Sequence, residues 1–299
     1  MNPGLRAARS ILGPGLAVAL FGCAGPLPRP DLHYTLGKPY QAGGVWYYPR
    51  EAFSLDETGI AAIAKTGSPR LTADGELFDQ TALAAGHPTI QLPAIARLTN
   101  LENGRAVTVR LNDRGAGDPR RLIEITSRTA VLLAMEPGSV ARVRLQVLPN
   151  ESHAAADALA GAPSLAITAV PRGTVEVAEL PPPPGVRQGN GRTLPAVAVT
   201  RAVESATEAP PMRQPETVTQ TIPHPGRLMV RLDTFEDYRY ANMQRVKMSG
   251  AGAQIISTLD RRTHLYRVEI GPLSDVAHAD AVLEQALAAG IPDARIVVD

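Results

Sequence analysis

The sequence is poor in the residues that cross-link small domains or stack against ligands. Cys23 is the only cysteine among 299 residues, which excludes an intramolecular disulfide and a cysteine-only zinc site. Aromatic residues make up only 4% of the chain, so the places where they gather are informative. The net charge of +1 gives no general argument for a nucleic-acid partner. The six histidines are scattered without ligand spacing, so we expect no metal and no cofactor.

The apolar stretch nearest the N-terminus is too short to span a membrane. It runs from Ile11 to Phe21, contains a Gly-Pro-Gly break and follows two arginines, whereas a spanning helix needs about 20 apolar residues. This layout predicts a signal peptide over residues 1–22. Cys23 directly after a glycine resembles a bacterial lipobox, in which the cysteine is lipidated. Ala24 at the next position favours a lipoprotein that is anchored in the outer membrane and faces the periplasm. The alternative is an ordinary signal peptide with an incidental cysteine.

Composition divides the rest of the chain into four parts. Residues 23–57 hold a proline-rich tether and then the only tryptophan with four of the seven tyrosines. We expect this aromatic segment to pack on the next domain, although a plain edge segment fits the pattern too. Residues 150–226 contain 12 of the 27 prolines and no aromatic residue, which predicts a disordered linker with a reach on the order of 200 Å.

The two remaining parts have the patterns of folded domains. Residues 58–149 alternate in several short stretches, such as 95–98, 107–111 and 140–147, with helices expected at 78–85 and after Thr126 or Ser127. Many short strands with few helices predict a small closed β-barrel. Residues 227–299 follow the order βαββαβ, which is the ferredoxin-like motif. The fold class is therefore mainly β with an α+β C-terminal domain.

Several short stretches occur in an order that resembles a known family. They are YTLGKPYQ (34–41), TADGE (72–76), AAGH (84–87), TNLENGR (99–105) and NDRG (112–115). Together they resemble the rare lipoprotein A family, septal ring lytic transglycosylases with a six-stranded double-psi β-barrel. The stretches VRLDTF (230–235) and YRVEIGP (266–272) resemble a SPOR domain.

This resemblance implies an activity and a place of action. The family splits the glycosidic bond between N-acetylmuramic acid and N-acetylglucosamine in peptidoglycan and leaves a 1,6-anhydro sugar. The SPOR domain implies binding to glycan strands stripped of stem peptides, which enriches the protein at division sites beside septal proteins. Nucleic acid is not an expected partner.

The resemblance also selects site residues. Asp113 is the expected general acid/base, with Glu76 as electrostatic stabiliser or second acid, and these two roles can be exchanged. His87 is expected to orient a carboxylate or to donate to the glycan. The alternatives are a turn role for Asp113, a surface charge for Glu76 and a histidine packed under a loop.

Further residues are expected to bind substrate. Arg114 and Asn112 flank Asp113, and Arg114 can either grip the glycan or pair with Asp113. In the SPOR domain the expected glycan contacts are Arg231, Tyr266 and Arg267, although strand alternation allows only one of the last two to face the ligand.

Two departures from the family pattern keep rival functions open. The family's Ser-Trp-Tyr-Gly segment is replaced by an Ala-rich stretch after Ile60, and its usual aspartate after Arg-Ile-Ile is Glu124. Without the aromatic platform, the rivals are a non-enzymatic glycan-binding septal lipoprotein and an expansin-like module that loosens wall polymers without cutting them.

Overall fold

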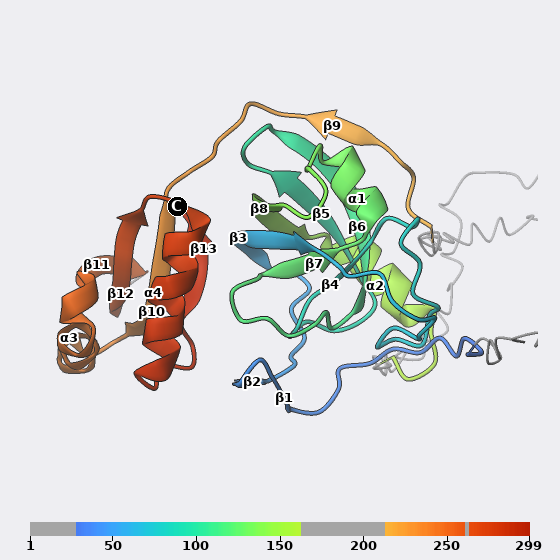
Figure 1. Cartoon of the computed structure of the whole chain (residues 1–299). Helices are drawn as coiled ribbons and strands as arrows, with labels where there is room; N and C mark the ends of the chain where they lie inside the picture. The colour runs from blue at the N-terminus through green and yellow to red at the C-terminus, as the bar shows by residue number, and fades with distance from the viewer. Residues whose placement is uncertain (1–27, 163–212, 261–262) are drawn as a thin grey trace, which may run out of the picture.

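The computed structural model describes residues 28–162, 213–260 and 263–299 (Figure 1). The expected signal peptide, Cys23 and the centre of the expected linker lie outside these residues. The N-terminal domain is drawn mainly in blue and green, and the C-terminal domain in orange and red.

The N-terminal domain is a closed six-stranded mixed β-barrel, as the alternation predicts. Its strands follow the order β4-β7-β3-β8-β5-β6, and a β4–β6 pairing closes the ring. The strands are β3 (Asp56–Ile63), β4 (Ala84–Gly86), β5 (Ala94–Asn100), β6 (Arg105–Asp113), β7 (Ile123–Ile125) and β8 (Val140–Val147). The β3–β7 and β4–β6 pairs are parallel, and the other pairs are antiparallel.

Alternate residues of each strand fill the barrel. Val107, Val109 and Leu111 of β6 are buried in one cluster with the inward residues of β5 and β8. Helix α1 (Ser127–Leu132) begins where predicted, because the Thr126 side chain accepts a hydrogen bond from the Thr129 N–H.

The helix expected at 78–85 does not form. The Asp79 carboxylate accepts hydrogen bonds from the backbone N–H and the hydroxyl of Thr81, which makes a local turn that competes with a helix. The residues that follow enter β4, where pairing with β6 and β7 satisfies their backbone.

The described ends of the expected linker are ordered on the barrel. Helix α2 (Pro149–Asp157) packs on β5, where the Ser152 hydroxyl donates to the Ile95 carbonyl and accepts from the Ile95 N–H. Strand β9 (Val218–Gln220) pairs with the first residues of β6 (Figure 1). The linker expected over residues 150–226 was therefore placed too widely.

The C-terminal domain has the ferredoxin-like topology that the sequence predicts. Its elements are β10 (Leu228–Phe235), α3 (Tyr238–Lys247), the 3₁₀ turn η1 (Ser249–Ala251), β11 (Gln254–Asp260), β12 (Thr263–Leu273), α4 (Val276–Ala288) and β13 (Arg295–Val298). The sheet order is β11-β12-β10-β13, and the helices cover one face with a buried apolar cluster.

The two domains are docked along β3 and β13. The Thr58 hydroxyl donates to the Val298 carbonyl at 2.6 Å and accepts from its N–H at 3.0 Å. Ile60 points out of the barrel yet is fully buried in the apolar cluster of the C-terminal domain. Arg121 adds a two-pronged ion pair with Asp280 of α4, at 2.7 and 2.8 Å.

An N-terminal hairpin, β1 (Tyr40–Ala42) and β2 (Val45–Tyr47), lies against the barrel, so the aromatic segment packs on this domain. Within the residues described, the helices are too short or too polar to cross a membrane.

Candidate active site

A groove of about 790 Å³ lies at the barrel end that carries the NDRG stretch. One wall is the loop 115–121, and another is the end of β3 with the residues 62–65. Glu284 and Leu287 of α4 reach the groove from the C-terminal domain. A cleft of this size falls in the range that binds small organic ligands.

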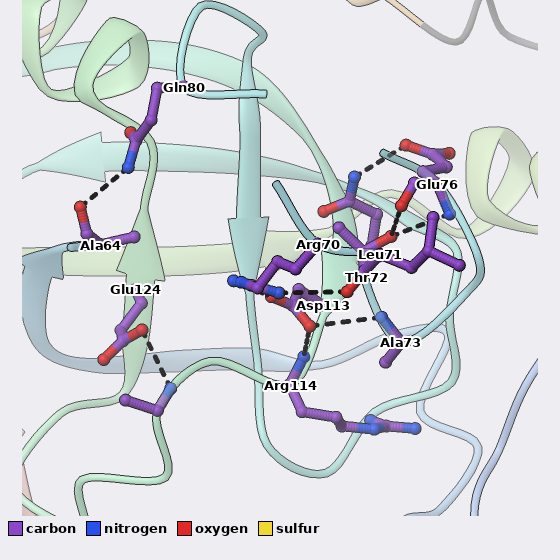
Figure 2. A network of polar contacts seen from close by, with 12 residues as sticks. Ala64, Arg70, Leu71, Thr72, Ala73, Glu76, Gln80, Asp113, Arg114 and Glu124 are labelled. Carbon is purple, nitrogen blue, oxygen red and sulfur yellow. Dashed lines mark hydrogen bonds and ion pairs between the residues drawn. The ribbon is translucent and has the colours of Figure 1, made fainter. Parts of the chain in front are cut away.

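Asp113 ends β6 beside this groove, and its carboxylate is held from several directions. Oδ1 accepts hydrogen bonds from the backbone N–H groups of Ala73 at 3.2 Å and Arg114 at 2.9 Å. Oδ2 forms an ion pair with Arg70 at 2.7 Å (Figure 2). Since every one of these partners is a donor, the surroundings suit an acceptor-only carboxylate. Arg70 itself is half exposed, so a substrate can reach this pair from the groove.

Glu124 of β7 is a second carboxylate at the same place. Asp113 and Glu124 together line a hollow of about 10 Å³ that shares Arg70, Gly115 and Glu124 with the groove. That volume is on the order of the space that one water molecule needs. Glu124 Oε2 accepts from the Ala116 N–H at 2.9 Å. Burial raises the pKa of Glu124, and the charges of Asp113 and Asp118 raise it further.

Glu76 lies on the other side of Asp113 from Glu124 in Figure 2 and does not line the groove. Its side chain is nearly buried, with Oε1 accepting from Arg110 Nε at 2.5 Å and Oε2 from Asn112 Nδ2 at 2.7 Å. Both oxygens are thus occupied by residues of β6. This geometry suits a residue that fixes the loop 72–76 onto the barrel rather than one that meets a sugar.

Asp74 is a second buried acid in that loop. Its Oδ1 accepts from the Thr72 hydroxyl at 2.7 Å, and its Oδ2 lies 3.7 Å from Arg110 Nη2. Burial raises the pKa of Asp74 to about 7, and the neighbouring Glu76 charge adds to this shift.

His87 is buried behind Asp113. Its backbone N–H donates to the Asp113 carbonyl at 2.9 Å, and its ring Nδ1 accepts from the Thr89 N–H at 3.3 Å. Burial lowers the pKa of His87 to about 3, helped by Arg114 and Arg50, so the ring is neutral near pH 7. Across the described residues, no hydrogen bond joins this ring to the Asp113 carboxylate.

Comparison with known proteins shows what the barrel is similar to. The lytic transglycolase family model matches residues 51–145, which cover the barrel. The endolytic peptidoglycan transglycosylase RlpA of Rickettsia felis is 35% identical over 125 residues, 40% of this chain and 55% of that protein. The protein of the same name from Escherichia coli (strain K12) is 36% identical over 180 residues, 56% of this chain and 47% of that protein. The barrel is thus similar to the lytic transglycolase family and to proteins named RlpA.

The chain spans about half the length of these curated family members. Two solved structures are also similar to the C-terminal domain. The RlpA SPOR domain from Pseudomonas aeruginosa matches at 21% identity and a TM-score of 0.23, covering 24% of this chain and 99% of that one. The peptidoglycan-binding domain of Bacillus subtilis CwlC matches at 25% identity and a TM-score of 0.22, covering 27% and 99%.

The two residues that flank Asp113 form contacts within the barrel domain in this structure. Arg114 turns away from the groove and donates to the carbonyls of Leu36, at 2.7 Å, and of Ile90. Asn112 donates to Glu76. Of the two roles considered for Arg114, neither a free grip on substrate nor a side-chain pair with Asp113 is seen among the described contacts.

The residues expected to contact glycan in the C-terminal domain divide between the two faces of the sheet. Arg231 and Arg267 both pair with the buried Glu269, at 2.8 and 3.3 Å, on the face without helices. Tyr266 packs toward the helices and meets Tyr238 of α3 edge-on. Strand alternation thus places only one of Tyr266 and Arg267 on the open face, as expected.

The sequence analysis selected Glu76 as a site residue and did not select Glu124, but in the structure Glu124 lines the groove and Glu76 does not. The signal for Glu124 was present, because it lies between the inward residues Ile123 and Ile125 and must point out of the core. In the part of the chain that the structure describes, no cluster of histidine, cysteine, aspartate and glutamate could hold a metal ion.

Proposed function

We propose that this chain is an endolytic peptidoglycan transglycosylase. The observation that carries the proposal is the pair of carboxylates, Asp113 and Glu124, that line one hollow beside a groove in a barrel of this family. The substrate is the bond between N-acetylmuramic acid and N-acetylglucosamine in glycan strands without stem peptides, and the product is a 1,6-anhydro sugar. The names of the curated relatives support this assignment.

The different surroundings of the two carboxyl groups divide the chemistry between them. Glu124, whose pKa is raised by burial, is the proton donor to the leaving glycosidic oxygen. Asp113, surrounded by donors, is the base that takes the proton from the 6-hydroxyl of the muramic acid. As the bond from C1 to the leaving oxygen breaks, the bond from C1 to O6 forms, so no water is consumed. Glu76 and His87 position the loop and the strand end around Asp113.

The location and the recruitment of the protein belong to the same proposal. We propose that Cys23 is lipidated and anchors the protein to the periplasmic side of a membrane, with the outer membrane favoured by Ala24. The SPOR domain binds stripped glycan and brings the barrel to the division site. If a Cys23→Ser variant stays in the membrane fraction of cells, the anchor is elsewhere.

The decisive test is digestion of purified sacculi stripped of stem peptides, with mass spectrometry of the soluble products. We expect anhydro-sugar products from the wild type and none from Asp113→Asn or Glu124→Gln. The glutamine keeps an oxygen that can accept from the Ala116 N–H, so its loss of activity reports on the missing proton. As a control, Asp56→Asn removes an exposed acid that is paired with Arg144 on the barrel side, and it should digest normally.

One observation favours a second function. The groove wall at residues 62–65 has no aromatic side chain, so the usual sugar platform after β3 is missing. A non-enzymatic septal lipoprotein, or an expansin-like module that loosens the wall, fits that feature. A wild-type protein that pulls down stripped glycan and releases no anhydro product would establish this second function and refute the first.

A further inference from the structure

The N-terminal hairpin has one face fixed to the barrel. On that face the rings of Tyr40 and Tyr47 stack with centroids 5.4 Å apart. The Tyr40 hydroxyl donates to the Pro88 carbonyl at 2.9 Å, and the Tyr47 hydroxyl donates to the Gly117 carbonyl at 3.3 Å. Because both anchors are barrel loops, the hairpin is held in place next to the site.

The opposite face of the hairpin presents two bare aromatic rings. Trp46 lies in β2 on the side opposite Tyr47, and Tyr48 directly follows this strand. They are 54% and 64% exposed, although the chain has few aromatic residues and Trp46 is its only tryptophan. Packing of the domain core does not explain these rings, since their partners Tyr40 and Tyr47 already bury the other face.

Trp46 and Tyr48, with Val45 and Tyr47 between and beside them, line a cleft of about 220 Å³ that also contains polar groups. Arg50 and Glu57 come from the barrel side, and residues 292–296 close the cleft from the C-terminal domain. Aromatic faces beside a guanidinium and a carboxylate suit a sugar, because the C–H face of the ring packs on the aromatic ring while hydroxyl and acetamido groups find polar partners.

This cleft adjoins the groove of the candidate active site. The loop residues Pro119, Arg120 and Arg121 line both the cleft and the catalytic groove. Gly43 at the hairpin tip also lines the groove and packs so closely on the Gly117 carbonyl that a Cβ would not fit. A glycan strand that occupies the groove therefore lies next to an aromatic surface.

We propose that Trp46 and Tyr48 form a sugar-binding subsite for the glycan strand on the hairpin side of the catalytic groove. The ligand class is a β-1,4-linked chain of N-acetylhexosamines. The subsite supplies the aromatic platform that the residues after β3 lack, and it rests on the proposed function for its place in a reaction but not for its binding chemistry.

The single tryptophan makes the test direct, because all tryptophan fluorescence of the full chain comes from Trp46. Chitin hexasaccharide and purified peptide-free glycan strands are titrated into the Asp113→Asn protein, so that no substrate is consumed. We expect a saturable shift of the emission and loss of quenching by acrylamide. Tyr48→Ala should weaken the titrated affinity by about tenfold, which corresponds to about 1.4 kcal/mol. Tyr240→Ala, which removes a similarly exposed ring on α3, should leave it unchanged.

Activity measurements separate the subsite from the proposed function. In the otherwise wild-type chain, Trp46→Ala should raise KM for glycan strands with little change in kcat, and Trp46→Phe should restore KM. If strands that pull down the full chain leave the emission and the quenching of Trp46 unchanged, the subsite does not exist, even when the wild type cleaves glycan. If Trp46 responds and the wild type cleaves nothing, the subsite stands and the transglycosylase proposal fails.

Discussion

Replacing the buried Asp74 by asparagine should stabilise the barrel at alkaline pH. Burial and the Glu76 charge raise the pKa of Asp74 from 3.8 to about 7, so holding this residue ionised in the folded state costs free energy. A shift of about three units at about 1.4 kcal/mol per unit sets an upper limit of roughly 4 kcal/mol. The lost attraction to Arg110 Nη2, 3.7 Å away, lowers the gain, and we expect about 1–2 kcal/mol.

The asparagine can keep the structural contacts of the residue that it replaces. Its amide oxygen can still accept from the Thr72 hydroxyl, as Asp74 Oδ1 does at 2.7 Å. The variant therefore tests the charge rather than the shape of the loop.

The sign of the pH dependence gives the assay its power. Between pH 3.8 and about 7 the folded wild type binds a proton at Asp74 that the unfolded chain releases, so its stability falls as the pH rises through this window. Urea unfolding at pH 8 and pH 4 should thus show a gain for Asp74→Asn at pH 8 that nearly vanishes at pH 4.

Asp79, an acid three residues after the loop 72–76, gives the opposite expectation because its pKa is lowered. Hydrogen bonds from Thr81 lower the pKa of Asp79, so Asp79→Asn should destabilise the protein at pH 8, with a difference that shrinks in acid. An Asp74→Asn protein that is less stable than the wild type at pH 8, or that keeps its full gain at pH 4, would refute the reasoning.

Three further variants test the roles assigned to buried and interdomain groups. Glu76→Ala leaves the buried Arg110 without its closest carboxylate and should cost about 3 kcal/mol or more in thermal unfolding, so lost activity with unchanged stability would restore a chemical role for Glu76. The pKa of the folded His87 is lowered to about 3, so the wild type should lose stability as the pH falls from 6.5 toward 3. The variant His87→Gln should lose less stability over that range. A wild type whose stability is constant over that range contradicts this. Arg121→Ala removes the ion pair with Asp280 and should speed hydrogen exchange at β13, while an unchanged exchange pattern would show that the pair does not hold the domains together.

The elements that the sequence predicted are those whose pattern is set by burial on one side. Strand β8 alternates along its whole length and β5 and β6 alternate over part of theirs, and α1 has a capping threonine, so local rules identify them. The three residues of β4 carry no such pattern in their Ala-Ala-Gly sequence. Their conformation is decided by pairing with two strands that lie far away in the chain.

Dependence on distant parts of the chain also explains why Glu124, and not Glu76, reaches the groove. Arg110 lies on the outward side of β6, where an arginine side chain is normally exposed to solvent. The sequence therefore gives no reason to expect that Arg110 is a buried partner of Glu76. In the closed barrel the loop 72–76 covers Arg110, and this contact holds Glu76 away from the groove. The position of Asp113 was predictable because it depends on the end of one strand.

The pairing of β9 with β6 changes how far the C-terminal domain can travel. Seven residues, 221–227, separate β9 from β10, and even fully extended they span about 25 Å. The free reach on the order of 200 Å expected from linker composition is therefore not available while β9 stays paired. If the C-terminal domain captures a glycan strand, as proposed, that strand is held at an effective concentration in the millimolar range at the barrel surface. The encounter of the strand with the barrel is then an intramolecular event, largely independent of the protein concentration.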